Sequence, residues 1–403
     1  MQALCTVCGG DALIRSLTFG RQPLSTCLGN HPTSSITTPL NELSIGFCRS
    51  CATIQLVDRF PLSILQEKYP GGQFKEPSAH LPAVADKLIE LNALRTDSSI
   101  LGLSYIDIAL MDLLSERGYG SGQIVSFDQI VPWQKSFGLE SMQSVVSNPE
   151  FAKFIGDKHG KLDLICARFI LEHAESAYTF LRTLVQLVNP GGYLVIEVPD
   201  AGKMLSCSHH ALVWEDHFTY FSPSSLLRLI SGIGALPVDL SLYSYAYENV
   251  IVAILQVDDT QKPSRSVATP GELEVVTEAL QEFAEKFDFC KQRVREELKQ
   301  RLSAGERLAI FGAGHHSAKY LNFYGVADLV EYAIDDNPNK QSLYMPGTDI
   351  AIKDSRFLIE SKITTCLSPL SPESEMKVRQ SIAPFFERGG EFIPILEQNG
   401  VNE

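Results

Sequence analysis

Two pairs of cysteines near the start of the chain have the spacing of metal-binding turns. Two residues lie between Cys5 and Cys8 and between Cys48 and Cys51, and 39 residues separate the pairs. Each turn presents two thiolates, so that two turns complete a closed tetrahedral site for structural zinc. A redox pair and four unrelated buried cysteines are the alternatives. The spacing predicts a zinc-binding module over residues 1–60.

Polar side chains gather where two apolar strands of the middle region are expected to end. The strand DLICA begins at Asp163 and the strand YLVIEV at Tyr193, with an amphipathic helix and an Asn-Pro-Gly-Gly turn between them. Such strands are typical of a parallel sheet covered on both faces, whose ligands bind at the carboxyl ends of the strands. The polar residues there are Arg168, Glu172, His173, Glu197 and Asp200. The sequence therefore predicts a site here, with a helix-start role for Glu172 as the alternative.

Asp216 and His217 are neighbours in the segment that follows these strands. A carboxylate beside an imidazole can orient the ring and raise its basicity, which a general base requires. We therefore predict that His217 is a catalytic base supported by Asp216. The alternative is a structural histidine in a polar stretch.

A second glycine turn lies close to the carboxyl terminus. Gly312 and Gly314 separate an apolar strand from a helix, and Asp335 and Asp336 follow the next strand about 23 residues after Gly312. This pattern is typical of half a Rossmann unit, in which the helix amino terminus suits a phosphate. The alternative is a Rossmann-like half that binds nothing.

Length and composition narrow the class of protein. A chain of 403 residues predicts two to three domains, and 44% hydrophobic with 20% charged residues is ordinary for a globular protein. A net charge of −14 argues against nucleic acid or an anionic membrane as a partner. No apolar run approaches the ~20 residues that span a bilayer, and the first residues lack a signal-peptide layout. The scattered, odd number of cysteines fits reduced thiols, so we expect a cytoplasmic protein.

Three motifs, taken in chain order, resemble a known family. The runs ARFILEH, NPGGYLVIEVP and DHFTYFS resemble the middle domain of the S-adenosylmethionine-dependent C-methyltransferases that act on nucleotide-linked deoxysugars. The cysteine pairs and the run DDNPNKQSLYMPGTDI resemble the two ends of the same proteins. The resemblance implies an α/β protein with a class I methyltransferase-like Rossmann domain, an N-terminal zinc-binding module and a C-terminal Rossmann-like domain. Its parts are the zinc module (1–60), the methyltransferase-like domain (61–256), a linker with a bridging helix (257–304) and a nucleotide-sugar-binding domain (305–403).

The resemblance also implies a binding site for the methyl donor. The family has an acid and two glycines where this chain has Gly102, Ser104 and Ile108, while Asp107 is retained. A β-branched residue takes a positive φ only at a cost, and we expect the Ile108 side chain to project towards the ligand. Asp128 is expected to accept hydrogen bonds from the ribose hydroxyls, with a strand-end cap as the alternative. The predicted donor-binding residues are Gly102, Ser104, Asp107, Asp128 and Arg168.

Further residues are implied at the acceptor end. Tyr69 is a catalytic candidate in a segment that resembles the family near donor and sugar, with an ordinary linker as the alternative. Tyr220 is a candidate donor to an enolate oxygen or else a core residue. The predicted substrate-binding residues are His80, Trp214, His315, His316, Lys319 and Lys340.

The expected activity is methyl transfer to a carbon next to the ketone of a nucleotide-linked deoxysugar, a step of deoxysugar biosynthesis. His217 removes a proton, and the enolate attacks the methyl group at near-attack distance. One alternative is a binding or regulatory protein without catalysis, because Gly102, Ser104 and Ile108 replace the family's donor residues. Another is a methyltransferase with a non-sugar acceptor, because Trp214 and Glu215 replace Tyr and His of the family. Beyond a small-molecule nucleotide sugar the sequence predicts no partner, and it makes no prediction of the oligomeric state.

Overall fold

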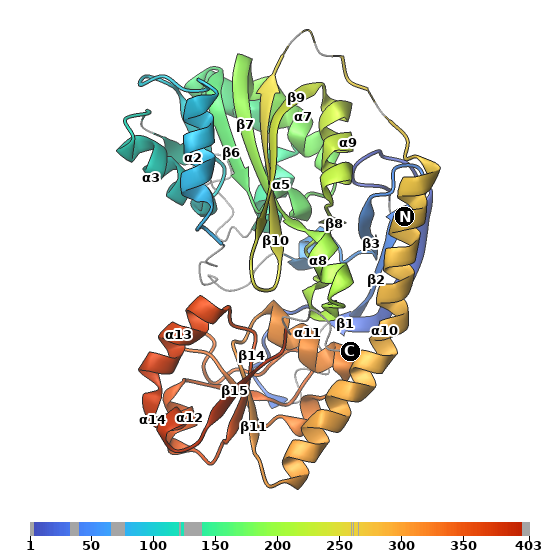
Figure 1. Cartoon of the computed structure of the whole chain (residues 1–403), viewed down its shortest axis with the longest axis vertical. Helices are drawn as coiled ribbons and strands as arrows, with labels where there is room; N and C mark the ends of the chain where they lie inside the picture. The colour runs from blue at the N-terminus through green and yellow to red at the C-terminus, as the bar shows by residue number, and fades with distance from the viewer. Residues whose placement is uncertain are drawn as a thin grey trace.

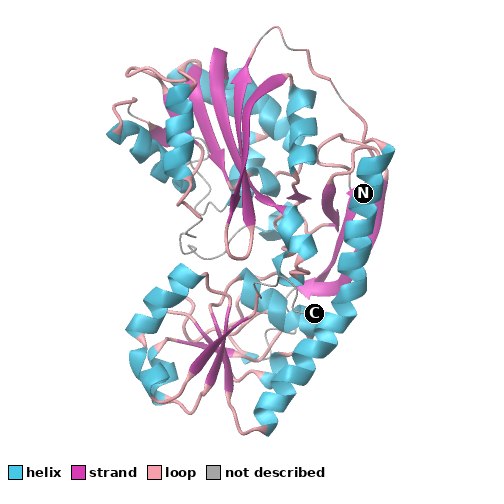
Figure 2. Ribbon diagram, viewed as in Figure 1, coloured by secondary structure: helices cyan, strands magenta, loops and turns pink. Residues whose placement is uncertain are grey.

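The computed structural model describes residues 4–32, 40–65, 77–120, 122–124, 139–258, 260, 262–264 and 266–396. Three sheets organise these residues, and a long helix runs beside them (Figures 1 and 2). Two of the predicted site residues, Tyr69 and Asp128, lie outside the described residues. Among the helices that are described, none combines the length and the apolar character that crossing a membrane requires.

The first sheet is antiparallel and takes its last strand from the middle of the chain. Its strands, in spatial order, are β1 (Leu13–Pro23), β2 (Leu40–Cys48), β3 (Ile54–Asp58) and β8 (Thr219–Tyr220). A short helix, α1 (Leu62–Leu65), follows β3. Because Ile54 pairs with Tyr220, the cysteine-bearing part of the chain holds the segment directly after His217. This sheet therefore helps to position the predicted base.

The second sheet has six strands. In spatial order they are β5 (Gln123–Ile124), β4 (Ile100–Gly102), β6 (Leu162–Arg168), β7 (Val188–Asp200), β10 (Asn249–Val257) and β9 (Ala235–Ser244). The first four strands are parallel, and the last two are antiparallel to their neighbours. The order reverses between β4 and β6, which is where ligands of open α/β sheets bind. The arrangement agrees with the expected class I methyltransferase-like Rossmann domain.

Helices cover both faces of this sheet, which explains its apolar strands. One face carries α2 (Leu81–Glu90), η2 (Tyr105–Asp107) and α3 (Ile108–Glu116). The other carries α5 (Leu139–Val146), α6 (Pro149–His159), α7 (Ala177–Leu187) and α9 (Pro223–Ile233). Short helices at the strand ends are η3 (Leu171–His173), α8 (Ala201–Ser206) and η4 (His210–Leu212). Side-chain caps start several of them: Ser176, for example, accepts a hydrogen bond from the Thr179 N–H.

The predicted turn at residues 189–192 differs in the structure. Strand β7 already begins at Val188, which pairs with Leu162. The pairing is irregular before Leu164 meets Tyr193. Gly191 takes a φ of 81° there, in the region that favours glycine. The segment is therefore a bulged entry into the strand and not a separate turn.

The third sheet is wholly parallel, as the predicted Rossmann-like unit requires. Its strands are, in spatial order, β13 (Ala351–Lys353), β12 (Tyr332–Ile334), β11 (Leu308–Phe311), β14 (Thr365–Ser368) and β15 (Glu391–Pro394). The helices around it are α11 (His315–Tyr324), η5 (Ala327–Leu329), α12 (Arg356–Glu360), α13 (Pro372–Ser381) and α14 (Ala383–Glu387). The turn between β11 and α11 has Gly312 at a φ of 78°, and the Asp335 carboxylate accepts from the Ala313 N–H at 2.8 Å.

The predicted bridging helix is α10 (Pro270–Ser303), which runs along the first sheet and reaches the third (Figure 1). Thr269 and Glu272 form its capping box. Phe287 of α10 packs edge-on against Phe19 of the first sheet, at a centroid distance of 5.1 Å. Phe19 in turn stacks on Phe323 of α11 at 4.1 Å. One apolar core therefore joins the first sheet, α10 and the third sheet.

His210 of η4 is buried in this joint core, and we predict that it makes stability depend on pH. Burial lowers the pKa of His210 to about 4 from an ordinary 6.5. The neutral ring therefore stabilises the fold fully above pH 6.5, and its contribution is lost as pH falls towards 4. His210→Gln keeps an N–H donor for the Phe283 carbonyl, which the imidazole Nε2 approaches at 2.8 Å. Between pH 6.5 and 4, the unfolding free energy of this variant, measured with urea, should fall less steeply with decreasing pH than that of the wild type. The difference should correspond to about one proton less taken up on unfolding. An unchanged slope would contradict the assignment.

Candidate active site

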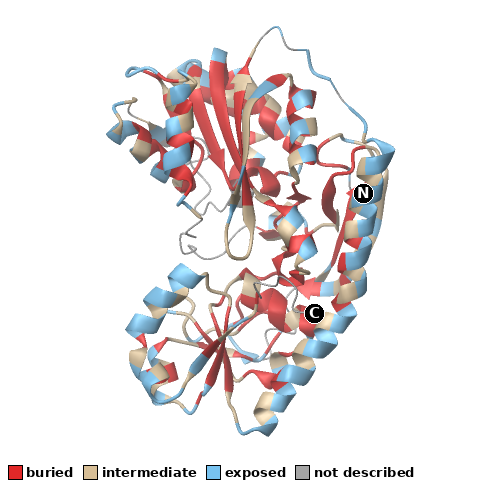
Figure 3. Ribbon diagram, viewed as in Figure 1, coloured by how far each residue is buried: buried red, intermediate tan, exposed pale blue. Residues whose placement is uncertain are grey.

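Three histidines and two carboxylates meet between the second and third sheets. Glu172 and His173 come from η3 after β6, Asp216 and His217 precede β8, and His315 is the first residue of α11. We call these five residues the histidine cluster. All five are buried, and the most exposed of them retain only 8% of their accessible surface. Figure 3 shows that the central strands of the second and third sheets are largely buried.

The contacts inside the histidine cluster differ in one respect from the predicted pairing. The Oδ2 atom of Asp216 lies 3.4 Å from Nε2 of His315 and 3.9 Å from Nδ1 of His173. The rings of His173 and His217 meet edge to face, with centroids 4.6 Å apart. Asp216 therefore serves a group of histidines and not His217 alone.

Burial decides the protonation of these rings. It lowers the pKa of His217 to about 3, with His173 adding to the effect and Asp216 opposing it. Burial also lowers the pKa of His173. Both imidazoles are therefore neutral at neutral pH and have a lone pair that can accept a proton. One ligand atom each of Glu172, His173 and His217 lie within 4.8 Å of one another, so the same set is also chemically able to hold a divalent cation.

Trp214 and Tyr220 brace the cluster from one side. The indole of Trp214 stacks on the His315 ring at 4.9 Å, and His316 meets it edge-on at the same distance. The Tyr220 hydroxyl accepts from the Trp214 N–H at 2.8 Å and donates to the Trp214 carbonyl at 3.3 Å. Tyr220 was predicted as a donor to an enolate oxygen. Its one O–H is already used by the backbone, so the structure favours the core role.

The predicted donor turn is built without any residue in a positive-φ conformation. Ser104 accepts from the Ile106 N–H, and the turn closes as η2 after Gly102. Ile108 has a φ of −52° and is 42% exposed, so its backbone does not need the positive φ that a β-branched residue would resist. The Asp107 carboxylate accepts from the N–H groups of Leu103 and Ser104 at 2.9 Å each. A carboxylate inside the turn therefore binds amides that a glycine-rich turn offers to its ligand.

Arg168 links the donor turn to strand β7. Its guanidinium forms two hydrogen bonds to the Glu197 carboxylate and donates to the Ile106 carbonyl. Glu197 also lies 3.2 Å from Nε2 of His80, whose Nδ1 is 2.6 Å from the Tyr245 hydroxyl. Arg168 is 1% exposed. Its predicted contact with the donor therefore conflicts with its burial, and the structure gives it a bracing role. His80, a predicted substrate residue, likewise turns into the protein.

The charges at this end of the sheet suit a cation. Among the described residues, the carboxyls of Asp107 and Glu197 outnumber the guanidinium of Arg168. Burial raises the pKa of Asp107 to about 7, although its N–H donors oppose the rise. When Asp107 is ionised, its charge adds to the paired Arg168 and Glu197 and is compatible with the sulfonium cation of the expected methyl donor.

The predicted phosphate contacts of the third sheet separate into two kinds. Lys319 is 1% exposed, and its ammonium lies 2.5 Å from the carboxylate of Glu215, which is fully buried. A protein carboxylate thus already neutralises the charge of Lys319, which argues against its predicted contact with a diphosphate. Lys340 is partly exposed, with its ammonium 3.1 Å from Asp335. From the sequence, Glu215 was predicted only as a replacement for the His of the family. No pattern near Glu215 indicates that its partner is Lys319.

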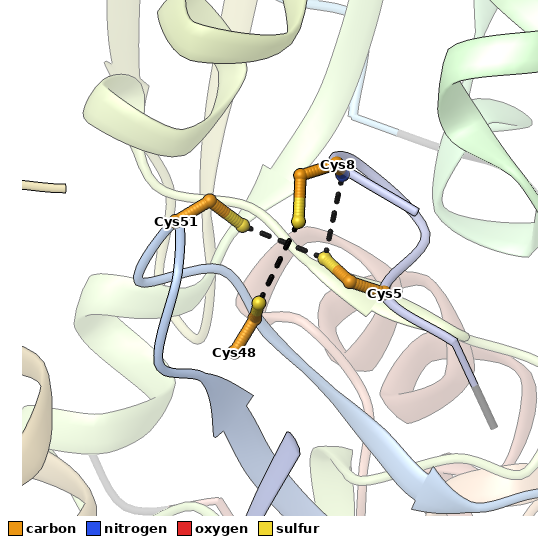
Figure 4. Close-up of side chains that lie close together, drawn as sticks. All are labelled: Cys5, Cys8, Cys48 and Cys51. Atoms are coloured by element: carbon orange, nitrogen blue, oxygen red, sulfur yellow. Dashed lines mark hydrogen bonds between the residues drawn. The ribbon is translucent and has the colours of Figure 1, made fainter. Parts of the chain in front are cut away.

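The four predicted zinc ligands converge (Figure 4). The sulfurs of Cys5 and Cys51 are 3.4 Å apart, and those of Cys8 and Cys48 are 3.6 Å apart. Four sulfurs at 2.3 Å from a tetrahedral zinc ion would be about 3.8 Å apart, which is close to these distances. The residues therefore fit a closed four-thiolate site.

Two families match separate parts of the chain. The family described as "Methyltransferase domain" matches residues 83–236, and the family described as "C-methyltransferase C-terminal domain" matches residues 254–396. The chain is 23% identical over 362 residues to C-methyltransferase NovU of Streptomyces niveus, covering 86% of this chain and 84% of that protein.

Solved structures match over about half of the chain. An O-methyltransferase family protein from Burkholderia thailandensis is 14% identical with a TM-score of 0.31, and the match covers 45% of this chain and 58% of that one, less than two thirds of its length. A SAM-dependent methyltransferase from Archaeoglobus fulgidus is 16% identical with a TM-score of 0.29, over 50% of this chain and 87% of that one. Similarity at this level carries no argument about substrate.

The buried ion pair of Lys319 and Glu215 leads to a prediction about stability. Lys319→Met leaves the Glu215 carboxylate buried without its cation, which should cost about 3–5 kcal/mol in the free energy of unfolding. Adding Glu215→Gln should recover most of this loss, since a neutral amide needs no counter-ion. Lys286→Met is the matched control, because Lys286 pairs with Glu282 on the exposed side of α10, and it should cost under about 1 kcal/mol. Urea unfolding measures all three; equal losses for the two lysine variants would refute the prediction.

Proposed function

We propose that this methyltransferase, whose two parts match a methyltransferase domain and a C-methyltransferase C-terminal domain, moves the methyl group of S-adenosylmethionine to a carbon next to the ketone of a nucleotide-linked deoxysugar. The observation that carries the proposal is the histidine cluster, which lies buried beside the carboxyl end of β6 and is completed by the third sheet. Neutral imidazoles held against a carboxylate in a water-poor position are suited to abstract a proton from carbon.

In the proposed reaction His217 accepts the proton. The carbon–hydrogen bond breaks, its electron pair forms the enolate double bond, and the proton moves to the imidazole. The negative charge of Asp216 opposes the low pKa of His217 and stabilises the imidazolium that forms. S-Adenosylmethionine, when bound, supplies the methyl cation equivalent that the enolate carbon receives. We propose that Gly102, Ser104 and Asp107 line its site, and that Tyr69 and Asp128 contribute as the sequence predicts.

The sugar nucleotide is proposed to lie between the histidine cluster and the third sheet. Trp214 and His316 border the cluster on that side, and Lys340 stands beside the glycine turn before α11. Lys340 is the residue best suited to meet a diphosphate, because its ammonium is partly exposed and lies next to the helix amino terminus. We also propose a cytoplasmic location, which agrees with the finding that none of the nine cysteines, all described, forms a disulfide.

The proposed activity can be tested with and without the methyl donor. With donor carrying a ¹³C-methyl group and a thymidine diphosphate-linked 4-keto-6-deoxyhexose, we expect the label on a carbon next to the ketone. Without donor, the enzyme in D₂O should exchange the proton at that carbon. His217→Gln should lower this exchange about 100-fold or more, because general-base catalysis contributes on that scale. Donor binding, measured by calorimetry, should be unchanged.

Two outcomes would argue against these roles. Full exchange by His217→Gln would remove the base assignment. The wild type could instead bind the donor but neither exchange nor methylate nucleotide sugars. That result would favour a non-sugar acceptor, the alternative suggested by Trp214 and Glu215.

A structural zinc ion in the four-cysteine site is the second part of the proposal. Its support is the convergence of Cys5, Cys8, Cys48 and Cys51 at distances close to those of a tetrahedral thiolate site. Such a site has no open position, so the ion would stabilise the first sheet and take no part in the chemistry.

Metal analysis of the purified protein should therefore give about one zinc ion per chain. Cys48→Ser should lose the ion and lower the melting temperature, because metal binding and folding of such modules are coupled. Cys27→Ser is the control, since Cys27 lies outside the cluster, and it should keep the metal. A metal-free wild type that melts like the zinc-loaded protein would disprove the role.

A further inference from the structure

We propose that His315 is a positioning residue: from the C-terminal domain it fixes the carboxylate of Asp216, and through Asp216 it sets the rate at which His217 takes a proton. This inference rests on the proposed function for its catalytic consequence. It departs from the predicted role of His315 as a substrate contact.

His315 reaches the cluster from far away in the sequence. It is the first residue of α11 and lies 99 positions after Asp216. Its Nε2 is 3.4 Å from Oδ2 of Asp216, and only 8% of the residue is exposed. The indole of Trp214 lies nearly parallel to the imidazole, at an interplanar angle of 27°, and limits the rotation of the ring. The orientation of His315 is thus set by protein contacts on its face and at its edge.

Two imidazole nitrogens face the same oxygen of Asp216. Oδ2 faces Nε2 of His315 from α11 and Nδ1 of His173 from η3. A carboxylate is free to turn about its Cβ–Cγ bond unless its oxygens are held. Nε2 of His315, the nearer of the two at 3.4 Å, restricts that rotation, and His217 follows Asp216 directly in the chain. His315 therefore determines where the negative charge lies relative to the proposed base.

A second contact shows that α11 holds this segment in register. Lys319 is one helical turn after His315, and it pairs with Glu215, the residue before Asp216. Ser25 of the N-terminal part adds a hydrogen bond from its hydroxyl to the same carboxylate, at 3.2 Å. Two successive residues of the loop are thus held by two residues that share one face of α11. Loop and helix can only be displaced together.

The charged and titratable groups around Asp216 and His217 come from three elements. Those around His217 are Glu172, His173, Asp216, His315 and His316. Lys319 of α11 forms its ion pair with Glu215. His315 and His173 both face Asp216, so replacing one of them changes its surroundings directly. The C-terminal domain therefore completes the proposed site through His315, although none of its residues takes the proton.

Two variants of His315 separate positioning from substrate contact. His315→Leu keeps bulk but loses the N–H donor, and His315→Gln keeps a donor at a similar reach. The readout is donor-free exchange in D₂O with the thymidine diphosphate-linked 4-keto-6-deoxyhexose. His315→Leu should lower the maximal rate about 10-fold or more, on the lower part of the scale of general-base effects, with KM changed less than about twofold. His315→Gln should restore most of the rate.

The control is Tyr324→Phe, a change on the same helix but near His210, with the hydroxyl 3.5 Å from its Nδ1. It should leave the exchange rate unchanged. A rise in KM alone for the His315 variants would show substrate contact and overturn the proposal. Both His315 variants could instead lose rate, while the wild type binds a second equivalent of metal that His173→Asn loses. That result would show a metal centre and would also overturn the proposal.

A measurement without substrate separates this inference from the proposed function. Melting temperatures are compared for Asp216→Asn, His315→Leu and the double variant. If the two residues interact, the double variant should lose clearly less than the sum of the single losses. Additive losses would refute the contact whatever the activity. Absence of exchange in the wild type, together with non-additive melting, would leave the contact standing and remove the proposed reaction.

Discussion

The hold of helix α11 on residues 214–217 is the interaction on which the rest of the structure depends. A buried charge is tolerated only when it is paired, so neither Lys319 nor Glu215 can leave the other without a large cost. The pair therefore fixes the third sheet against the loop that carries Asp216 and His217. The stacked rings of Phe19 and Phe323 strengthen the same joint with apolar contact. The positions of Asp216 and His217 therefore depend on how the third sheet packs against their loop.

The same principle appears at the donor end of the second sheet. The C-methyltransferases that the sequence resembles have glycines in this turn, which let the backbone approach a ligand closely, and this chain has Ser104 and Ile108 in their place. Its turn is held by the carboxylate of Asp107 and by the guanidinium of Arg168, which also binds Glu197. Side-chain hydrogen bonds thus hold this turn in a conformation that needs no glycine at a positive φ. Ile108 fits because the rebuilt turn needs no positive φ.

Much of the architecture was predictable because it rests on local patterns. Apolar runs identified β6 and β7, and the bridging helix predicted within residues 257–304 is α10. The cysteine pairs also converge as their spacing implied. Predictions for single polar side chains were less successful. Arg168, Lys319 and Tyr220 were taken for ligand contacts, and each proved to be used inside the protein by Glu197, Glu215 or the Trp214 backbone.

The sequence by itself determined which segments form strands and helices, which faces are apolar and which residue types could do acid–base or metal chemistry. Only the tertiary structure decided that His315 lies beside Asp216 and that β8 joins the first sheet. The physical reason is the range of the interactions. Periodicity and caps act between residues a few positions apart, so they can be read along the chain. The partner of a buried charge is set by packing between distant segments, and nothing in its own neighbourhood records which partner that is.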